Sequence, residues 1–413
     1  MIIKRKRYLD QIKNAFGSVP IVILIGARQV GKTTLMNSYE IHGSCMKVHG
    51  QDATEAELFS KLPLIRQHLS MNFGPQLEGT LLIDEFQYIP GIDTMLKLLA
   101  DKFPLLKILC TGSSSLDILN KMKESMAGRV RYIPVYSLSF TEFLLFTDPE
   151  LLKNFDILTP DDDLRLLDPR IPFLMNEYLV YGGLPKVALT NDPSEKVNLL
   201  TDIMRSYLLH DVRNFIRNED FIKFNKVLRL LASQIGGMVN ISEISRTTGL
   251  SYTRCEEYVH ILEQMYILNM VAPYTTNKRN EITRMRKVYF FDPGIRNILQ
   301  NDFNGIETRI DNGALFENFV FQELIKEVIR PESIRYYRTR DGMKIDFILE
   351  KGGSVFPIEV KFRNYKKPPS DRGIKSFDNI KTYRKAWFIN RNCNTTQGKI
   401  HYLPGYYVSK INI

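Results

Sequence analysis

A glycine-rich loop near the start of the chain limits the folds that this sequence can adopt. Five apolar residues, Ile21–Ile25, predict a short buried strand, and a helix is expected to begin at about Lys32. The segment between them matches the pattern G-x-x-x-x-G-K-[ST] at every fixed position. Strand, loop and helix in this order are typical of a loop that holds phosphate groups with its backbone N–H groups. Strands and helices continue to alternate beyond it, so we expect an α/β domain with a parallel sheet.

The residues of this loop are the candidate contacts to a nucleotide, ATP. Gly26 and Gly31 let the backbone bend so that its N–H groups face the phosphates, and the helix that follows adds its partial positive charge. Lys32 can reach the β- and γ-phosphates, and the hydroxyl of Thr33 can bind Mg²⁺. The predicted nucleotide-binding residues of the loop are Gly26, Ala27, Arg28, Gln29, Val30, Gly31, Lys32, Thr33 and Thr34.

Two later strands end in polar residues that suit the same site. Residues 80–85 form an apolar run that ends in two acids, Asp84 and Glu85. Behind such a loop, Asp84 is expected to hold Mg²⁺ at the nucleotide, and Glu85 to polarise the water that attacks the γ-phosphate. The next apolar strand, residues 105–110, leads into a row of hydroxyl side chains, and Ser113 is the candidate contact to the γ-phosphate or to the attacking water.

Arg129 lies between the third strand and the next predicted strand, in the sequence Ala-Gly-Arg-Val. An arginine near the γ-phosphate stabilises the charge of the transition state, whether it comes from the same chain or from a neighbouring one. The alternative is an arginine in a surface salt bridge. We interpret Arg129 as a catalytic candidate, and action on a neighbouring chain would require a homo-oligomer.

Composition excludes several classes of protein. A chain of 413 residues with 44% hydrophobic and 25% charged residues has room for two or three domains with cores of their own. It contains no apolar run of 18 residues, so we expect no membrane span, and its basic first residues lack the apolar stretch of a secretory signal. The four cysteines form no C-x-x-C pair, which favours reduced thiols and a cytoplasmic protein.

The net charge of +10 is concentrated at the end of the chain. Residues 361–413 carry twelve Lys or Arg and only two acids, Asp371 and Asp378, so this segment accounts for the whole formal excess. A basic end domain suggests a polyanionic partner, and we expect sequence-independent binding of DNA. The alternative is a solvated basic surface without a partner.

The middle of the chain contains two short patterns with open interpretations. The turn at residues 181–185, Tyr-Gly-Gly-Leu-Pro, either contacts the nucleotide base or simply joins two helices. Residues 241–247 and 253–270 predict a helix-turn-helix, and a basic hairpin at residues 275–288 would complete a winged helix. Acids on the second helix argue against base reading, so this region either contacts DNA without sequence preference or is a spacer. The basic residues of the hairpin are Lys278, Arg279, Arg284, Arg286 and Lys287.

The last third predicts a helix, three strands, a second helix and a further strand. Asp346 lies on the second of these strands, and Glu359 and Lys361 lie on the third. Residues two apart on a strand share a face, so Glu359 and Lys361 can meet Asp346 on the neighbouring strand. Two carboxylates can hold Mg²⁺, and Lys361 can position or deprotonate a water molecule, with Glu317 on the preceding helix as an outer contact. The pattern is consistent with a metal-dependent nuclease site.

These motifs together resemble a family of bacterial and archaeal AAA+-like ATPases. The segments that carry the resemblance are GARQVGKTT (26–34), LLIDEFQ (81–87), TGSSS (111–115), AGRV (127–130), YGGLP (181–185), FDPGIRN (291–297), GALFENFVFQEL (313–324), KIDFIL and PIEVK. The resemblance implies a C-terminal domain of unknown function with a restriction-endonuclease-like fold, in which Asp and Glu-x-Lys form the catalytic signature. Members of the family tend to have an acid where this chain has Lys344.

The sequence therefore predicts four parts: a P-loop ATPase domain (1–150), a helical lid or linker region (151–236), a winged-helix-like domain (237–300) and a restriction-endonuclease-like domain (301–413). The expected function is ATP hydrolysis with Mg²⁺, coupled to a basic nuclease-like domain that acts on DNA. The alternative is a nucleotide-switched regulator that binds DNA or protein and in which the nuclease-like fold is inert. The sequence specifies no protein partner.

Overall fold

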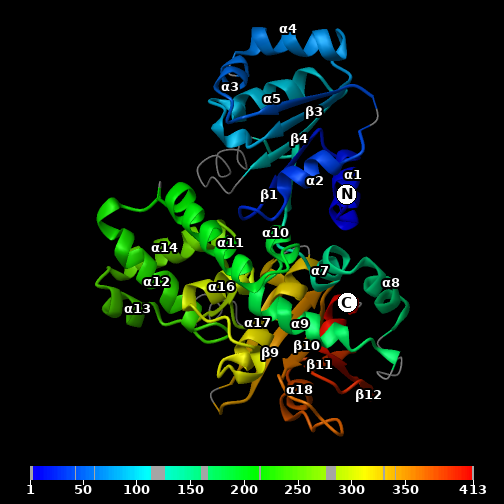
Figure 1. Ribbon diagram of the computed structural model, residues 1–413, viewed down its shortest axis with the longest axis vertical. Helices are drawn as coiled ribbons and strands as arrows, with labels where there is room; N and C mark the ends of the chain where they lie inside the picture. The colour runs from blue at the N-terminus through cyan, green and yellow to red at the C-terminus, as the bar shows by residue number, and fades with distance from the viewer. Residues whose placement is uncertain are drawn as a thin grey trace. The chain divides into compact units, whose positions relative to one another are not determined.

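The computed structural model divides the chain into two compact units. The first comprises Met1–Tyr136 with Leu209–Asp211 and Gln264–Tyr266, and the second comprises the rest (Figure 1). The described residues are 3–41, 43–59, 61–112, 126–159, 166–213, 215–275, 285–328, 331–339 and 341–411.

The first unit contains a five-stranded parallel sheet in the order β2-β3-β4-β1-β5. All five residues of β1 are buried, as expected for a strand covered on both faces. Because β4 lies between β1 and β3, the carboxyl ends of these three strands meet at one edge of the sheet. The strands are β1 (Ile21–Ile25), β2 (Cys45–His49), β3 (Gly79–Asp84), β4 (Leu106–Gly112) and β5 (Val130–Pro134).

Helices connect the successive strands from β1 to β4, and the α/β class predicted for this part of the chain is confirmed. The helix after the glycine-rich loop begins at Lys32, as the sequence predicts. The helices of the first unit are α1 (Lys6–Phe16), α2 (Lys32–Ser38), α3 (Ala53–Leu58), α4 (Leu62–Phe73) and α5 (Ile92–Lys102).

The second unit starts with a helical region and continues into a helix-turn-helix with a hairpin. Two helices, α13 (Ile241–Thr248) and α14 (Tyr252–Gln264), lie on either side of a turn at Gly249, whose φ is +69°. The second helix is shorter than predicted, because Tyr266 takes a left-handed conformation with φ of 58° and the chain then enters a strand. The other helices of this region are α7 (Phe140–Thr147), α8 (Pro149–Ile157), α9 (Arg170–Tyr181), α10 (Pro185–Ala188), α11 (Pro193–Ser206) and α12 (Phe221–Ser233).

The hairpin of strands β6 (Leu268–Val271) and β7 (Lys287–Phe290) is antiparallel, and every residue of β7 is buried. It also joins the sheet of the last third, because the backbone N–H of Tyr274 donates to the carbonyl of Tyr336 at 2.6 Å. The helix-turn-helix region and the C-terminal third are therefore connected through backbone hydrogen bonds as well as through side chains.

The C-terminal third is a six-stranded sheet in the order β12-β13-β11-β10-β9-β8. Strands β8, β9 and β10 are antiparallel neighbours, while β10, β11 and β13 are parallel. The predicted order of helix, three strands, helix and strand is confirmed, and β12 and β13 extend the sheet. The elements are α16 (Pro293–Gln300), α17 (Asn312–Glu327), β8 (Ile334–Arg338), β9 (Lys344–Lys351), β10 (Ser354–Val360), α18 (Arg372–Phe377), β11 (Ala386–Asn390), β12 (Thr395–Gln397) and β13 (Ile400–Pro404).

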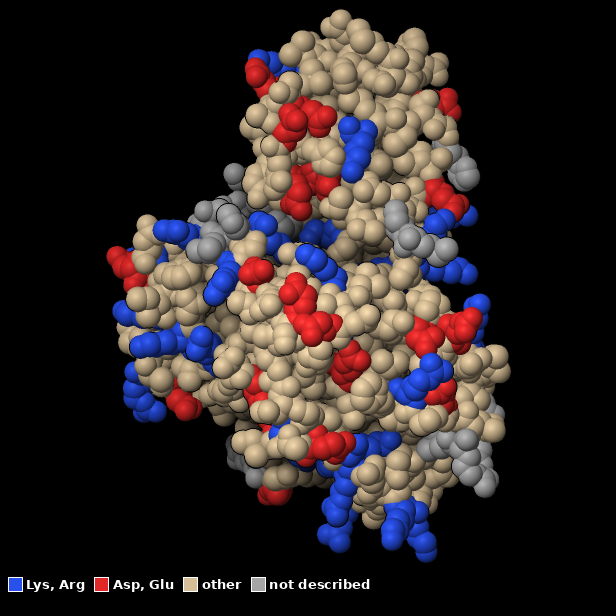
Figure 2. All heavy atoms as spheres, viewed as in Figure 1, with Lys and Arg blue, Asp and Glu red and all other residues tan. Residues whose placement is uncertain are grey.

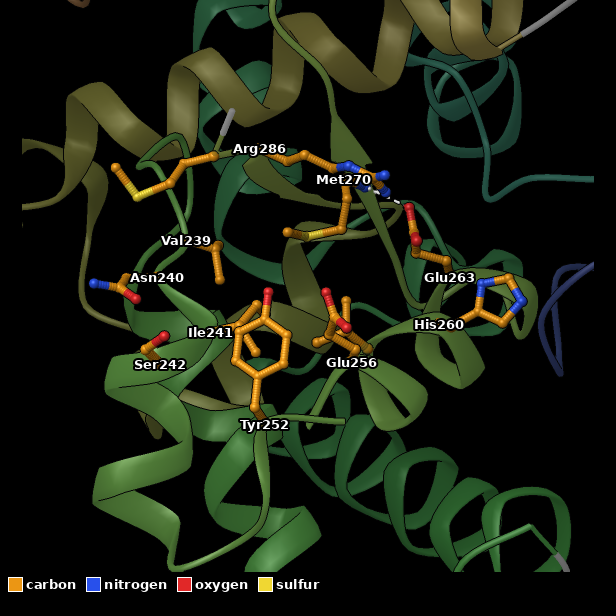
Figure 3. Close-up of a pocket in the computed structure, with 12 residues that line it drawn as sticks. Val239, Asn240, Ile241, Ser242, Tyr252, Glu256, His260, Glu263, Met270 and Arg286 are labelled. Atoms are coloured by element: carbon orange, nitrogen blue, oxygen red, sulfur yellow. Dashed lines mark hydrogen bonds between the residues drawn. The ribbon is translucent and has the colours of Figure 1, made fainter. Parts of the chain in front are cut away.

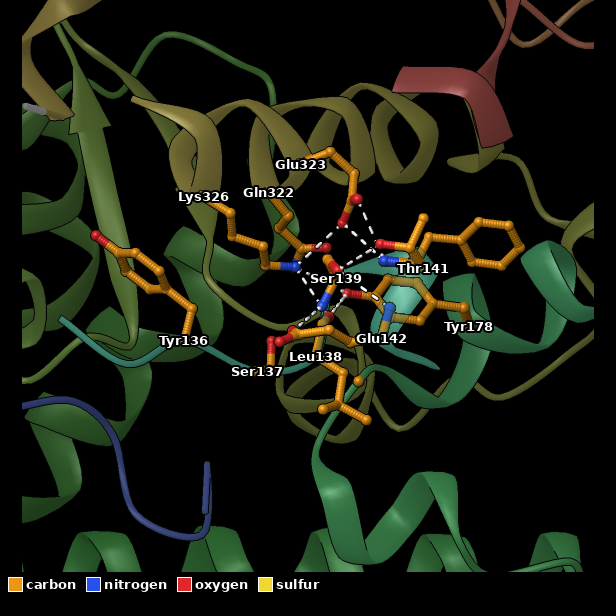
Figure 4. A network of polar contacts seen from close by, with 12 residues as sticks. Tyr136, Ser137, Leu138, Ser139, Thr141, Glu142, Tyr178, Gln322, Glu323 and Lys326 are labelled. Atoms are coloured by element: carbon orange, nitrogen blue, oxygen red, sulfur yellow. Dashed lines mark hydrogen bonds and ion pairs between the residues drawn. The ribbon is translucent and has the colours of Figure 1, made fainter. Parts of the chain in front are cut away.

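Helix α17 is buried along most of its length and holds the parts of the second unit together (Figure 4). The carboxylate of Glu323 accepts the backbone N–H of Phe140 at 3.2 Å through each oxygen. The ammonium group of Lys326 donates to the carbonyl of Leu138 at 2.9 Å, to the Tyr178 hydroxyl at 3.2 Å and to Glu323 at 3.1 Å. These buried polar groups are satisfied only when residues from both ends of the unit are present.

These contacts change the predicted division of the chain. The main stretch of the first compact unit ends at Tyr136, and residues 137–150 belong to the second unit, where Leu138 and Phe140 contact α17. Apart from Leu209–Asp211 and Gln264–Tyr266, the three later predicted parts lie in this second unit. Sequence patterns locate changes in local structure, but they do not show which segments share a core.

Candidate functional site

The glycine-rich loop at the end of β1 has the backbone that the motif requires. Gly26 has a φ of +154° and Gly31 a φ of +90°, and Gln29 is also left-handed at 59°. A Cβ atom at Gly26 would lie 2.2 Å from the carbonyl oxygen of Val135, so no larger residue fits there. The glycine pattern is therefore a steric requirement of this loop.

Lys32 is buried within this loop, with only 6% of its surface exposed. Its ammonium group donates to the carbonyl oxygens of Gly26 at 3.0 Å and Ala27 at 2.7 Å. The positive charge is thus held at the mouth of the loop by backbone oxygens. A phosphate group bound there would meet an ammonium group that is already in place.

An arginine from the start of the chain supports the loop from behind. The guanidinium group of Arg5 is buried and donates to the carbonyl oxygens of Val30 at 3.1 Å and Tyr136 at 3.0 Å. No sequence pattern predicts this role, because Arg5 stands in a basic N-terminal stretch whose side chains would be expected at the surface. Of the other loop residues, Val30 is buried, while Gln29 and Thr34 are exposed.

The oxygen ligands predicted for Mg²⁺ come together at the carboxyl edge of the sheet. The hydroxyl of Thr33 donates to Oδ1 of Asp84 at 2.9 Å, and Asp84 is 5% exposed. The hydroxyl of Thr111, at the end of β4, also donates to Oδ1 of Asp84. His49 at the end of β2 lies 3.6 Å from the other carboxylate oxygen, Oδ2. The hydroxyl of Thr33 and the carboxylate of Asp84 are in contact, and Mg²⁺ prefers oxygen ligands of this kind. The residues present therefore fit this ion.

Glu85 directly follows Asp84 and adopts a left-handed conformation, with φ of 51° and ψ of 48°. Its backbone N–H donates to the hydroxyl of Thr111 at 3.2 Å, and its carboxylate accepts the side-chain amide of Gln87 at 2.5 Å. A non-glycine residue in this conformation is uncommon and is associated with functional sites. The turn places Glu85 directly after Asp84 at the end of the strand.

Three contacts at this edge were not among the predicted site residues: Thr111, Gln87 and His49. Thr111 bonds both acids of the pair, and it is the first residue of the polar stretch that the sequence marked at the end of the third strand. The spacing of Gln87 and His49 gave no signal. The predicted contact Ser113 lies outside the described residues.

The structure places Arg129 at the opposite edge of the sheet from the loop. Its carbonyl oxygen accepts the N–H of Ile21, the first residue of β1, whereas the loop follows the last residue of that strand. At about 3.3 Å per residue the two edges are roughly 13 Å or more apart. Its side chain forms a salt bridge with Asp101, with Nε 2.5 Å from Oδ1. A catalytic role for Arg129 at the loop of its own chain is therefore not supported, and the salt-bridge alternative describes the observed contact.

The three acids predicted for the C-terminal site do lie together. Glu317 comes from α17, Asp346 from β9 and Glu359 from β10, and all three are largely buried. Asp346 is fully buried, and its Oδ2 accepts the backbone N–H of Val360 at 3.0 Å. The predicted convergence of Asp346, Glu359 and Lys361 on one face of the sheet is confirmed.

Three lysines, however, occupy the surroundings of these acids. Lys287 from β7 lies 2.8 Å from Glu317 and 3.7 Å from Asp346. Lys344 and Lys361 approach Asp346 at 3.3 Å and 3.5 Å. Lys361 also pairs with Glu359. We call this set of Glu317, Asp346, Glu359, Lys287, Lys344 and Lys361 the lysine-paired acid cluster; its formal charges balance.

The pKa values in the cluster follow from burial and these pairs. Burial opposes ionisation of Asp346, but Lys287, Lys361 and Lys344 outweigh it and hold its pKa below the usual value. Burial, followed by repulsion from Asp346, raises the pKa of Glu317, and the same two causes raise that of Glu359 to about 7. Burial alone would lower the pKa of Lys287, but the charges of Glu317 and Asp346 raise it. Asp346 and Lys287 are therefore a charged pair in the interior.

The interpretation of Asp346 and Glu359 as metal ligands stays a prediction. The structure shows no group of three or more His, Cys, Asp or Glu side chains placed to hold a metal ion within the described ranges. Ammonium groups pair with both carboxylates, so a metal ion would have to compete with them. The replacement of an acid by Lys344 contributes one of these ammonium groups directly.

The predicted wing of the helix-turn-helix region is described only in part. Lys278, Arg279 and Arg284 lie outside the described residues, and Arg286 is exposed. Lys287 is not a surface cation, because 7% of it is exposed and it belongs to the lysine-paired acid cluster. The run of basic residues along the hairpin gave no indication that β7 enters the interior.

A pocket of about 370 Å³ lies between this hairpin and the helices α13 and α14 (Figure 3). Its lining includes Tyr252, Glu256, His260 and Arg286, and Glu263 accepts the backbone N–H of Met270 at 2.8 Å. Burial raises the pKa of Glu263, against the effect of that N–H and of Arg286. We assign this pocket no ligand.

The glycine turn at residues 181–185 is held by an aspartate from a distant segment. Asp292 accepts the backbone N–H groups of Gly183 at 2.9 Å and Gly294 at 2.9 Å, and a Cβ atom at Gly182 would collide with its carboxylate. Asn297 donates to the carbonyl oxygens of Leu179 and Val180. These contacts describe a turn that joins helices within the second unit, and they leave the base-contact interpretation without support.

Three regions of the chain match known protein families. Residues 18–144 match an AAA domain, residues 173–306 a domain of unknown function (DUF8612), and residues 312–406 another domain of unknown function (DUF4143). The first match covers the glycine-rich loop and the acid pair on β3. It supports membership of a P-loop ATPase family for this part of the chain.

Similar proteins occur in bacteria and in an archaeon. An uncharacterized protein of Mycobacterium tuberculosis is 24% identical over 367 residues, which covers 87% of this chain and 74% of that protein. One of Haemophilus influenzae is 26% identical over 380 residues and covers 87% of each chain. One of Methanocaldococcus jannaschii is 24% identical over 340 residues, with 80% and 72% covered.

Solved structures also show some likeness. A Walker-type ATPase of Pyrococcus abyssi has a TM-score of 0.49 at 16% identity, with 72% of this chain and 96% of that chain covered. A signal transduction ATPase with a tetratricopeptide repeat sensor from Pyrococcus horikoshii has a TM-score of 0.32 at 13% identity, with 79% and 46% covered.

None of the helices in the described part of the chain has the length and apolar character needed to span a membrane. The loop geometry, the contact between Thr33 and Asp84 and the matched AAA domain agree with one another. Residues 18–144 are therefore similar to an AAA domain and contain the strands of the parallel sheet, and the two regions that follow match families without an assigned function.

Proposed function

We propose that the chain hydrolyses ATP in the presence of Mg²⁺ and that its nucleotide state controls the action of its second unit on DNA. The observation that carries the first part is the hydrogen bond of 2.9 Å between Thr33 and Asp84, with Glu85 next in sequence. Loop, Mg²⁺ ligands and a candidate base are then at one edge of one sheet. This is the arrangement that hydrolysis of a γ-phosphate requires.

Each side chain has a separate task in this proposal. The backbone N–H groups between Gly26 and Thr33 hold the phosphates, and Lys32 neutralises part of their charge. Thr33 and Asp84 would hold Mg²⁺, which offsets further phosphate charge when it is bound. Glu85 accepts a proton from the attacking water, while Gln87 fixes the orientation of its carboxylate.

The link to DNA rests on the charge of the second unit. Lys and Arg side chains project from the end of this unit that carries α18 (Figure 2). If nucleotide state controls DNA binding, the two affinities must be coupled in both directions. Action of Arg129 on a neighbouring copy of the chain stays a separate prediction that this proposal does not need.

A nucleotide analogue tests the coupling. We expect a non-hydrolysable ATP analogue with Mg²⁺ to change the affinity for duplex DNA by roughly five-fold or more, the lower end of typical coupling between two sites. The Lys32→Ala variant should bind DNA with the same affinity with or without the analogue. Fluorescence anisotropy of a labelled duplex measures both. Equal affinities of the wild type under both conditions would remove the coupling from the proposal.

For the second unit, the lysine-paired acid cluster favours binding over cleavage. Asp346 already has three ammonium groups within 3.7 Å, and Lys361 is also paired with Glu359. A divalent cation would have to displace these charges to reach the carboxylates. Of the two functions considered, the regulator with an inert nuclease-like fold is therefore the better supported.

Metal binding and cleavage test this choice. In the Lys32→Ala variant, whose nucleotide site is disabled, we expect the heat of Mn²⁺ titration to be the same with and without Glu359. We also expect the wild type to leave duplex, single-stranded and branched DNA intact with Mg²⁺ or Mn²⁺. The matched comparison is the same protein with Glu359→Ala, titrated identically. Cleavage that Glu359→Ala abolishes would establish the nuclease function and refute the inert site.

A further inference from the structure

The segment between β10 and β11 carries an unusual concentration of exposed cations. Within residues 363–385, which we call the basic segment, every Lys and Arg side chain is exposed. With partners among the described residues, these side chains form no ion pair and no hydrogen bond. They are Arg363, Lys366, Lys367, Arg372, Lys375, Lys381, Arg384 and Lys385.

The acids of the same segment do not offset this charge at the surface. Asp371 is 5% exposed and accepts the backbone N–H of Ile374 at 2.6 Å, as the cap of α18. Asp378 pairs with Lys399 at 2.9 Å, a cation from outside the segment. The segment therefore presents positive charge to the solvent without a matching negative charge from its own residues.

The backbone that carries these cations is fixed to the sheet. The hydroxyl of Tyr402 donates to the carbonyl of Pro369 at 2.9 Å, and the N–H of Tyr365 donates to Asn392 at 2.7 Å. Ile374 and Phe377 on α18 are fully buried, so Arg372 and Lys375 lie on its outer face. A surface held in this way loses little backbone freedom when it binds a partner.

The aromatic rings of the segment point inward. The ring of Tyr365 packs edge-on against Phe388 with centroids 5.7 Å apart, and Phe377 packs against Tyr274 and Tyr337. Tyr383 is 4% exposed. Proteins that bind single strands stack bases on exposed rings, and this segment offers none. Its chemistry suits a regularly spaced row of phosphates, as in a duplex backbone.

We infer that the basic segment is a docking surface for the phosphate backbone of duplex nucleic acid. It binds this backbone without sequence preference. This inference rests on the proposed action on DNA and assigns it to one part of the basic end of the chain, not to the predicted hairpin. Phosphate contacts position a protein on nucleic acid but carry no sequence information. The binding should therefore be strongly dependent on salt and indifferent to sequence.

Charge reversal tests the assignment. The variant with Lys366, Lys367, Arg372 and Lys375 all changed to Glu should bind a 30-base-pair duplex at least about ten-fold more weakly at 0.1 M salt. The slope of log K against log salt should become shallower by up to about 0.9 for each lost phosphate contact. The control changes four other exposed cations to Glu, namely Arg66, Lys97, Lys102 and Lys153, and alters the net charge equally.

The outcomes are distinct. Loss of duplex binding in the first variant, with near wild-type binding in the control and unchanged ATP turnover in both, supports the inference. Equal losses in both variants would show a general effect of net charge and overturn it. Tighter binding of anionic vesicles or of single strands than of duplex by the wild type would overturn it as well. If the wild type binds no DNA at low salt, the proposed function itself fails.

Discussion

The Glu85→Gln variant will bind ATP with nearly wild-type affinity and hydrolyse it roughly 10²–10⁴-fold more slowly, the range expected for loss of a positioned general base. Glutamine keeps the size of the side chain and a hydrogen bond to Gln87, but it cannot accept a proton from water. The backbone N–H of residue 85 still donates to Thr111, so the strand end should keep its conformation. Single-turnover hydrolysis and nucleotide binding, measured on one preparation, separate the two effects.

Two further variants provide comparisons for this result. Glu78→Gln makes the same chemical change at an exposed position and should leave turnover unaltered. Lys32→Ala should instead weaken nucleotide binding, because it removes the ammonium group held at the mouth of the loop. Turnover by Glu85→Gln equal to that of the wild type would exclude Glu85 as the base and leave Asp84 as the main functional acid of the pair.

The second large effect is expected on stability. Replacing Lys287 by Met should lower the free energy of unfolding of the second unit by about 3–5 kcal/mol, the usual cost of removing one partner of a buried ion pair. Lys287 is the partner of Glu317 at 2.8 Å and also faces Asp346 at 3.7 Å, both in the interior. The variant would leave these two carboxylates close together with less compensating charge.

The single tryptophan makes the measurement specific. Trp387 lies on β11 and is 4% exposed, so its fluorescence reports unfolding of the C-terminal sheet. Adding Glu317→Gln to Lys287→Met should restore part of the loss, because one buried charge is removed. Arg286→Met, at the exposed neighbouring position, should change stability by at most about 0.5 kcal/mol. An unchanged urea midpoint for Lys287→Met would show that the cluster is solvated.

The features of the site's geometry that the sequence predicts are those determined by local rules. A strand followed by G-x-x-x-x-G-K-T determines its own backbone, since Gly26 and Gly31 are required by steric contact and by positive φ. Asp84 could be placed because the carboxyl ends of parallel strands share an edge. Asp346 and Glu359 could be paired because a period of two fixes the face of a strand.

The sequence does not show an environment that depends on distant residues. Arg129 comes directly before β5, which is parallel to β1, so it lies at the sheet edge opposite the glycine-rich loop. Its position in the sequence shortly after the third strand does not show this. Lys287 was grouped with surface cations because its neighbours are basic, whereas β7 is covered by α17 and the C-terminal sheet. Arg5 was overlooked because its partners are backbone carbonyls, which leave no mark in a sequence.

The shared core of the second unit has a consequence for how such chains can be cut and recombined. A fragment that begins at residue 312 keeps Glu323 and Lys326 but lacks their partners at residues 138–140, and it keeps Glu317 without Lys287. Lys410 also needs a partner that this fragment lacks, since its ammonium group donates to the carbonyl of Leu158 at 2.8 Å. The two regions matched by separate families therefore share one core. Gene fusions that preserve a folded product should exchange residues 137–411 as a whole.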